Sequence, residues 1–175
     1  MMKVHSFLLS ILLMMGFALG VNAQRRFFVE GGVAFPSASI SAGGYSISAD
    51  FNTTFYAGIG GQSHISSQAA CEYGVQYTQL AAKRGSSTSY LRVPVAVTYQ
   101  VSPTFPLSIG GGAYLAAAID DTTEIDFGLL AKLKFHFTKN LFAGATYHYG
   151  LRKFDIVGAG GIRINSFQLG LGYMF

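Results

Sequence analysis

Apolar side chains recur at every second position along much of this chain, a period that is typical of β-strands with one apolar face. The alternation is most regular in four stretches, which are residues 90–101, 127–137, 141–152 and 167–175. Weaker alternation occupies four more, at about 27–35, 53–61, 70–81 and 106–119. The sequence therefore predicts eight strands and an all-β fold.

The scarcity of charge decides which way the apolar face points. Charged residues make up 11% of the chain and hydrophobic residues 50%, whereas soluble domains carry about 25% charged residues. A soluble barrel could not cover its outer surface with so few charges. In a bilayer the apolar residues face the acyl chains, and a closed barrel satisfies every backbone N–H and C=O group. We therefore expect an eight-stranded antiparallel up-and-down transmembrane β-barrel over residues 24–175.

The first 23 residues predict a different role from the rest. Lys3 precedes an apolar run at residues 7–21, and Val21-Asn22-Ala23 gives the small-x-small pattern of a signal peptidase site. The alternative is a membrane-anchoring helix, for which the apolar run is short against the roughly 20 residues needed. We predict a cleavable signal peptide at residues 1–23 and an outer-membrane location for the mature chain.

The predicted strands are joined by connections of two kinds. The turns at residues 102–106 and 138–140 are short, whereas the connections at 36–52 and 153–165 are long. Short turns at the end that holds the termini and longer loops at the other end are typical of bacterial outer-membrane barrels. We expect 36–52 and 153–165 to be external loops, and the first to be a candidate for binding an extracellular partner through Tyr45, Ile47 and Phe51.

One strand pair allows a register to be predicted. If the strands on either side of 138–140 form a hairpin centred on Lys139, Phe135 faces Ala143 and Lys132 faces Thr146. In this register apolar residues meet apolar residues throughout, whereas a slip of one residue would mix the two faces.

Pro94 stands inside a predicted strand of a closed barrel, which offers no free edge. Since proline lacks the N–H group that the strand ladder needs, we expect a bulge here or the loss of one ladder bond.

Aromatic residues gather near the predicted strand ends, as the interface girdles of a membrane barrel require. This expected girdle comprises Phe27, Phe28, Phe35, Tyr99, Phe135, Phe137, Tyr149, Tyr173 and Phe175.

The strand alternation also predicts which charged residues point into the barrel. An eight-stranded barrel is just wide enough to be filled by its side chains. The expected inward set contains two acids and four bases, namely Glu30, Glu72, Arg92, Lys132, Lys134 and Arg152. We interpret these residues as a structural network of ion pairs and hydrogen bonds that fills the lumen, with a narrow anion-preferring passage as the alternative.

No arrangement of residues in the sequence predicts catalysis, a cofactor or a metal site. His136 and His148 share the inward face, but the register above separates them by about 20 Å along the strands. Cys71 falls on the lipid face, where a thiol stays protonated and inert, and residues 120–124 (DDTTE) predict a solvated loop tip. The chain also lacks a dense basic stripe, so no nucleic-acid partner is expected.

Two segments resemble known outer-membrane sequences. Residues 166–175 (SFQLGLGYMF) look like the C-terminal signal of bacterial outer-membrane proteins. That resemblance implies recognition by the barrel-assembly machinery through Leu171, Tyr173 and Phe175. Residues 90–95 (YLRVPV) resemble a strand of the PorT-like outer-membrane beta-barrel domain of Bacteroidetes, in which the position of Arg92 is often acidic. The architecture expected is similar to that of OmpA and OmpX.

From these observations we expect a small integral outer-membrane barrel with a structural or interaction role and no enzymatic activity. Its expected partners are outer-membrane lipids, the assembly machinery and an extracellular ligand of the loops. The PorT resemblance implies a second hypothesis, that of an accessory factor in protein secretion. A third is a secreted, soluble, lipocalin-like barrel that binds an apolar ligand.

Overall fold

The computed structural model describes residues 25–42, 45–81, 87–102, 104–119, 125–152, 154–156 and 160–175. The predicted signal peptide at 1–23 and the acidic connection at 120–124 lie outside the described residues. Side chains are described except at 40–50 and 154–162. Within this part of the chain, no helix is long and apolar enough to cross a membrane.

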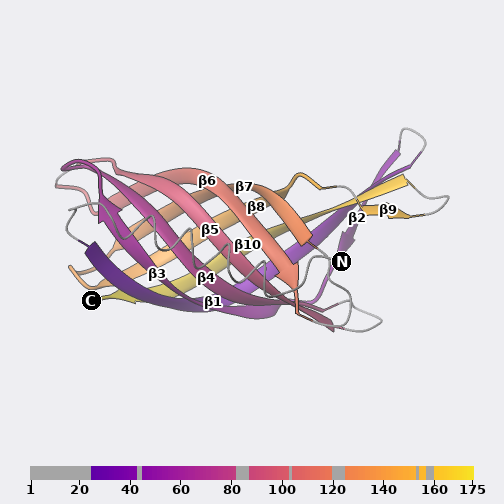
Figure 1. The fold of residues 1–175 in the computed structure, drawn as a ribbon, viewed down its shortest axis with the longest axis horizontal. Coiled ribbons are helices and arrows are strands. Elements are labelled where there is room, and N and C mark those ends of the chain that lie inside the picture. The colour runs from indigo at the N-terminus through magenta and orange to yellow at the C-terminus, as the bar shows by residue number, and fades with distance from the viewer. Residues whose placement is uncertain are drawn as a thin grey trace.

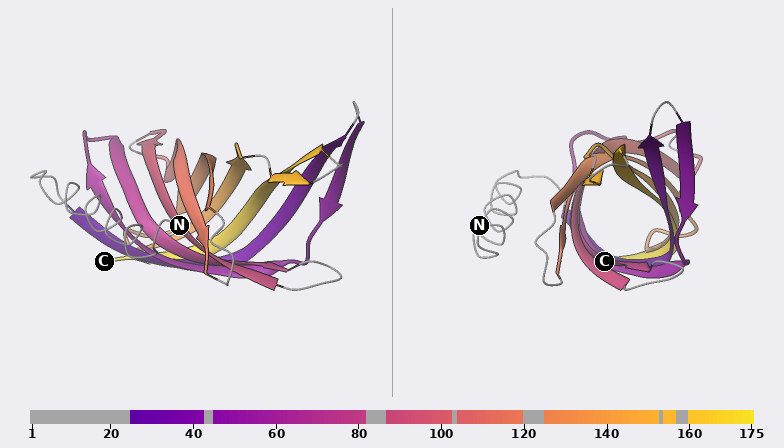
Figure 2. Two further views of the ribbon diagram at one scale, coloured as in Figure 1. Left: turned by 45° about the vertical axis from the view of Figure 1, so that its right-hand side comes forward. Right: turned by 90° about the vertical axis from the view of Figure 1, so that its right-hand side faces the viewer.

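The described chain folds into one antiparallel sheet that closes on itself. Its strands are β1 (Arg25–Ala42), β2 (Tyr45–Asp50), β3 (Thr54–His64), β4 (Ala69–Ala81), β5 (Ser87–Gln100), β6 (Leu107–Ala118), β7 (Ile125–His136), β8 (Leu141–Gly150), β9 (Phe154–Ile156) and β10 (Gly160–Met174). Each of β1, β3 to β8 and β10 pairs with the next in that series, and β1 pairs with β10. The eight-stranded up-and-down barrel predicted from the alternation is confirmed (Figures 1 and 2).

The predicted register of the hairpin around Lys139 is confirmed. Phe135 pairs with Ala143 and Lys132 with Thr146, so every second pair places two apolar side chains on the outer face. The turn between these strands is held by Thr138, whose hydroxyl accepts backbone N–H bonds from Asn140 and Leu141 at 3.2 and 2.9 Å.

The two long connections are not loops, which corrects the prediction for residues 36–52 and 153–165. Ser37–Ala42 of β1 pairs with Tyr45–Asp50 of β2, and β9 pairs with the start of β10. Their high content of serine and glycine suggested loops. The ladder between β1 and β10 nevertheless continues to Ser41 and Gly161, and it carries both hairpins beyond the barrel wall.

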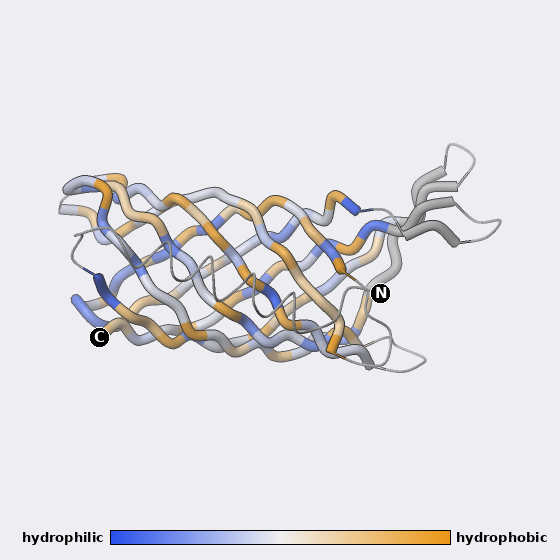
Figure 3. Tube along the Cα trace, viewed as in Figure 1, coloured by the Kyte–Doolittle hydropathy of each residue, from blue (hydrophilic) through white to orange (hydrophobic). Residues whose placement is uncertain are grey.

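The outer face of the barrel is apolar and the inner face is polar or small. Exposed side chains alternate with buried ones along β7, where Leu129 and Leu133 are exposed while Lys132 and Lys134 are buried. The alternating colours of the barrel strands in Figure 3 follow this pattern. An apolar exterior of this kind suits lipid and excludes the soluble, lipocalin-like alternative, which would bury its apolar face.

Aromatic side chains do occupy the outer rims, and several of them pair. Phe35 stacks on Phe167 with ring centroids 6.3 Å apart, and Tyr173 lies edge-on to Phe175 at 5.1 Å. Phe28 is a correction to the predicted girdle, because its ring is buried inside the barrel. Its even position in β1 places it on the face of Glu30 rather than on that of Phe27.

Pro94 interrupts a ladder without shifting it. The pairing of β4 with β5 stops after Tyr73–Val95 and resumes at Gln76–Arg92 in the same register. On the other side, Pro94 keeps its pairing with Tyr114 of β6. Of the two predicted consequences, the lost ladder pairing is the one found, and there is no bulge.

Candidate functional site

The middle of the lumen holds a compact ionic cluster built from three strands. Glu30 comes from β1, Glu72 from β4, and Lys132 and Lys134 from β7. All four side chains are at most 6% exposed. Each lies at an even position of a strand whose odd positions face outward, so the strand period aims all four at the same axis.

Glu72 is the centre of this cluster. Its Oε2 lies 2.8 Å from Nζ of Lys134 and 3.1 Å from Nζ of Lys132. Its Oε1 accepts a hydrogen bond from the hydroxyl of Thr98 at 3.4 Å. Both carboxylate oxygens are therefore engaged, which offsets the cost of holding a charge away from bulk water.

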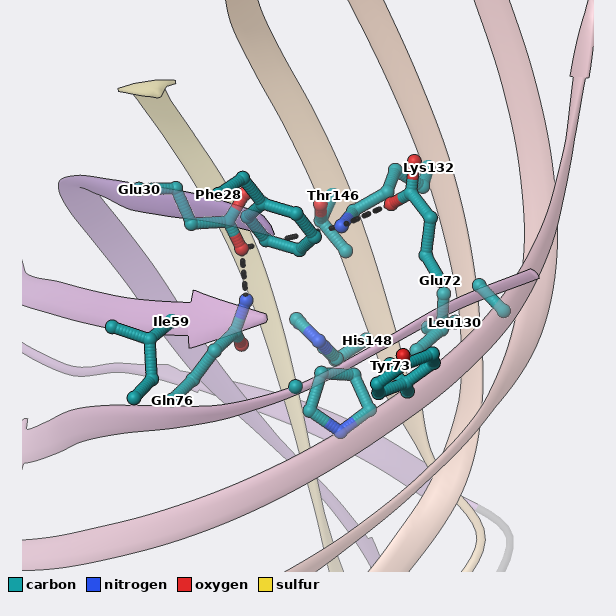
Figure 4. Close-up of a pocket in the computed structure, with 13 residues that line it drawn as sticks. Phe28, Glu30, Ile59, Glu72, Tyr73, Gln76, Leu130, Lys132, Thr146 and His148 are labelled. Carbon is teal, nitrogen blue, oxygen red and sulfur yellow. Dashed lines mark hydrogen bonds and ion pairs between the residues drawn. The ribbon is translucent and has the colours of Figure 1, made fainter. Parts of the chain in front are cut away.

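Glu30 completes the cluster more loosely. Its Oε1 accepts a 2.6 Å hydrogen bond from Nε2 of Gln76 and lies 4.0 Å from Nζ of Lys132 (Figure 4). Two carboxylates thus face two ammonium groups, and the formal charges of the cluster sum to zero.

Two aromatic rings enclose the cation of Lys134. Its Nζ lies 4.4 Å from the ring centroids of both Phe28 and Phe142, a distance at which a ring face attracts an ammonium ion. The two rings meet edge to face at 6.1 Å. Phe142 in turn lies over Gly172, where an added Cβ would come within 2.1 Å of the ring.

A second polar cluster lies next to the first in the lumen. Arg92 donates from Nη1 to Nδ1 of His148 at 3.3 Å, and its guanidinium lies 4.9 Å from the ring centroid of Tyr114. The hydroxyl of Tyr114 donates to Oδ2 of Asp126 at 3.0 Å. This cluster therefore places the cation of Arg92 near the carboxylate of Asp126.

Arg152 lies at the rim of the lumen, close enough to Asp126 for their charges to interact. It lies beyond the end of β8, and its guanidinium donates to the carbonyl oxygen of Ile125 at the start of β7. The other five predicted residues divide into the Glu30, Glu72, Lys132 and Lys134 cluster and the neighbouring cluster of Arg92.

The ionic cluster leaves almost no open space around it. The cavity lined by Glu30, Glu72, Lys132, Gln76, Thr146 and His148 measures about 10 Å³, which is about the size needed for one water molecule (Figure 4). At this level the side chains themselves plug the barrel.

Sequence reasoning did not single out several members of these clusters. Asp126 has the even parity of Lys132, but it lies one residue outside the strand that the alternation predicted. Gln76, Tyr114 and Phe28 also lie on inward positions, so parity could have found them. Gln76 and Phe28 contact Glu30 and Lys134 on strands distant in sequence, and the sequence holds no signal for that choice. Tyr114 and Asp126 meet across the neighbouring strands β6 and β7.

The structure describes no alternative site for metal or thiol chemistry. Among the described residues, no three His, Cys, Asp or Glu side chains are close enough to hold a metal ion. His136 and His148 lie opposite Phe142 and Leu130, the register from which their separation was predicted. Cys71 is a free cysteine next to the inward Glu72 in β4.

The last strand closes the barrel and carries the predicted assembly residues. Tyr173 pairs with Val29 and Leu171 with Gly31, while the backbone N–H of Phe175 donates to the carbonyl of Phe27. All three side chains lie on the apolar exterior, and Phe175 is 67% exposed. They therefore form one apolar row along the closing strand.

Comparison with known proteins identifies the same architecture. The family model described as outer membrane protein beta-barrel domain matches residues 9–175. No curated protein matches the chain. Among solved structures, the attachment invasion locus protein Ail of Yersinia pestis aligns with a TM-score of 0.56 at 16% identity, covering 86% of this chain and 98% of Ail.

Two further solved structures are similar. Neisserial surface protein A has a TM-score of 0.53 at 18% identity, covering 85% of this chain and 97% of its own. The outer membrane protein OprG of Pseudomonas aeruginosa has a TM-score of 0.50 at 12% identity, covering 87% of this chain and 97% of OprG. At these identities the likeness establishes the fold alone.

Proposed function

Because this chain belongs to the outer membrane protein beta-barrel domain family, we propose that it is a non-enzymatic outer-membrane protein that presents an extracellular sheet to a partner. One observation carries the proposal. β1 and β10 continue past the barrel wall and are flanked there by β2 and β9, which gives a projecting four-stranded sheet in the order β2-β1-β10-β9.

The short turns support an extracellular position for this sheet. It lies at the end of the barrel opposite the C-terminus (Figure 1). Two turns at the C-terminal end, at residues 65–68 and 137–140, have four residues each, and the third spans residues 101–106. Outer-membrane barrels keep short turns in the periplasm and longer segments outside, so the projecting sheet belongs outside the cell.

The edges of the sheet make it suitable for binding. Among the described strands, β2 pairs with β1 alone and β9 pairs with β10 alone. The outer side of each edge strand offers backbone N–H and C=O groups to an added strand. An extended segment of a partner can therefore join either edge through main-chain hydrogen bonds.

The plugged lumen supports a role that does not involve transport. A cavity of about 10 Å³ between the ionic side chains admits no solute. The anion-preferring passage predicted as the alternative would need the Glu72 cluster to open. We therefore assign the barrel an anchoring role and place recognition in the projecting sheet.

A photo-crosslinking experiment in living cells tests the interaction role. A photoreactive amino acid replaces Ser48 in β2, and a matched variant carries it at Ser67 in the turn at the opposite end. We expect a discrete adduct from Ser48 and none of the same size from Ser67. The absence of any adduct specific to Ser48 would overturn the proposal.

A secretion-accessory role is the second candidate, favoured by the YLRVPV segment at residues 90–95 in β5. No comparison above singles out the PorT-like subgroup, and Arg92 occupies a position that is often acidic there. Deleting the gene tests this role. Normal export of all secreted proteins in the deletion strain would exclude it.

The same proposal includes how the protein is exported and assembled, which we infer from residues near the two ends of the sequence. We infer cleavage after Ala23, which N-terminal sequencing of the mature protein tests. We also infer that the assembly machinery reads Leu171, Tyr173 and Phe175. Replacing Phe175 with serine should reduce the fraction of heat-modifiable, folded barrel in the outer membrane, whereas the same change at exposed Phe105 should not.

A further inference from the structure

A cavity of about 250 Å³ opens inside the barrel at the end that holds the C-terminus. It is lined from several strands and turns, with Arg26 at the start of β1, His136 at the end of β7 and Lys139 in the following turn. By the orientation argued above, this end faces the periplasm. The cavity is therefore a vestibule of the periplasmic mouth.

The vestibule is lined by cations and neutral donors. Arg26 and Lys139 contribute two fixed positive charges, and none of the lining residues is Asp or Glu. The nearest acid of the plug is Glu72, which is already held by two lysines. Other acids lie at the opposite end, including Asp126 in β7 and the two aspartates of β2 and β9. Two cations and no acid in the lining make the vestibule attractive to anions.

One of the two cationic groups, the guanidinium of Arg26, is held in place by a hydrogen bond. The guanidinium of Arg26 donates from Nη2 to the carbonyl of Lys139, which ties β1 to the turn. Since a guanidinium has five N–H donors in a planar fork, others remain for a ligand. Thr138 accepts two backbone bonds through its hydroxyl oxygen, and its hydroxyl proton is left to donate.

The inner end of the vestibule is blind. Thr98 lines it and donates to Glu72, so the ionic plug forms its floor. The space around that plug measures about 10 Å³. An anion that enters from the periplasm is thus held and not passed through the membrane.

We propose that this vestibule binds a phosphate group carrying a small polar substituent. A guanidinium fork and an ammonium group suit phosphate oxygens, and hydroxyl and amide groups such as Thr138 and Gln100 add further donors. The 250 Å³ of this cavity is many times the roughly 10–15 Å³ that one water molecule needs, which leaves room beyond the phosphate itself. Two sources share this chemistry, namely a phospholipid headgroup of the inner leaflet and a soluble phosphate ester of the periplasm.

The test uses the folded barrel in phosphate-free alkyl glucoside micelles with two probes. Glycerol 3-phosphate represents the soluble ester, and dioctanoyl phosphatidylglycerol represents the lipid. Binding is followed by calorimetry and by the side-chain NMR signals of Arg26 and His136. We expect saturable binding that Arg26→Gln and Lys139→Gln each weaken about tenfold, the loss of one charge-assisted hydrogen bond.

Arg25→Gln is the matched control, because it removes the same charge from the neighbouring position. Arg25 has the parity of the outward-facing Phe27 and does not line the vestibule. Heat-modifiable migration checks that every variant is folded. Tighter binding of phosphatidylglycerol identifies the lipid as the source, and equal or tighter binding of glycerol 3-phosphate identifies the soluble ester. The proposal is overturned if neither probe saturates, or if Arg25→Gln weakens binding as much as Arg26→Gln.

Discussion

Lys134 lies 2.8 Å from Glu72 across the lumen, although their strands β7 and β4 are not neighbours in the barrel wall. This pair joins two parts of the wall that share no backbone ladder. Its ammonium group is also enclosed by the rings of Phe28 and Phe142. The pair therefore brings side chains of β1, β4, β7 and β8 into contact inside the lumen.

Replacing Glu72 with Gln should destabilise the barrel by about 3 kcal/mol, because two buried lysines lose their shared counter-ion. Glu30→Gln is the control, since Glu30 lies 4.0 Å from Lys132 and keeps Gln76 as a neighbour. Urea-induced unfolding in lipid vesicles measures the free energy of unfolding of both variants. Equal losses for the two variants would show that Glu72 is not the centre of the network.

The native barrel should show no channel events in a planar lipid bilayer, because the plug leaves about 10 Å³ open. Replacing Glu72, Lys132 and Lys134 together with alanine removes the side chains that fill the lumen, and discrete conductance steps should then appear. Heat-modifiable migration confirms that the triple variant is folded. Regular steps from the native protein would contradict the plugged lumen and favour the anion passage.

Gly172→Ala should cost about 1–3 kcal/mol through overpacking, because its Cβ would come within 2.1 Å of the Phe142 ring. That ring is buried against Phe28 and Met174 and has little room to move. Gly144→Ala on β8 is the matched control, because the nearest atom to its Cβ would be 3.9 Å away. The free energies of unfolding of the two variants are measured under the same conditions and compared. A similar loss at both sites would place the cost in the backbone rather than in the Phe142 contact.

Single cysteines at Val95, Leu133 and Leu169 should resist a water-soluble maleimide in native membranes. These three side chains lie on the apolar exterior, and each is more than 40% exposed in the protein alone. The background is Cys71→Ser, and a cysteine at Ser67 in the turn is the reactive control. Rapid labelling at all three sites in membranes would show that this face meets water and would reverse the assignment of the two faces.

The sequence predicted the barrel wall more accurately than the segments beyond its end. The register of β7 and β8 was predictable because a one-residue slip would turn polar residues outward, as Lys132 shows. The hairpins within 36–52 and 153–165 were not predictable, because their many serine and glycine residues are typical of loops. Their strand pairing depends on the long ladder between β1 and β10. Phe28 was misassigned for a related reason, because proximity to a strand end is weaker evidence than parity.

By itself, the sequence determined that this chain forms the eight strands of a barrel wall with an apolar exterior, and that Glu30, Glu72, Lys132 and Lys134 point inward. These features follow from a period of two, which is local and readable along the chain. Only the tertiary structure decided that Glu72 meets Lys134, that Arg92 joins His148 and Asp126 instead, and that a cationic vestibule forms at one mouth. Which side chains meet across the lumen depends on the stagger and closure of the barrel. A local stretch of sequence does not predict these contacts.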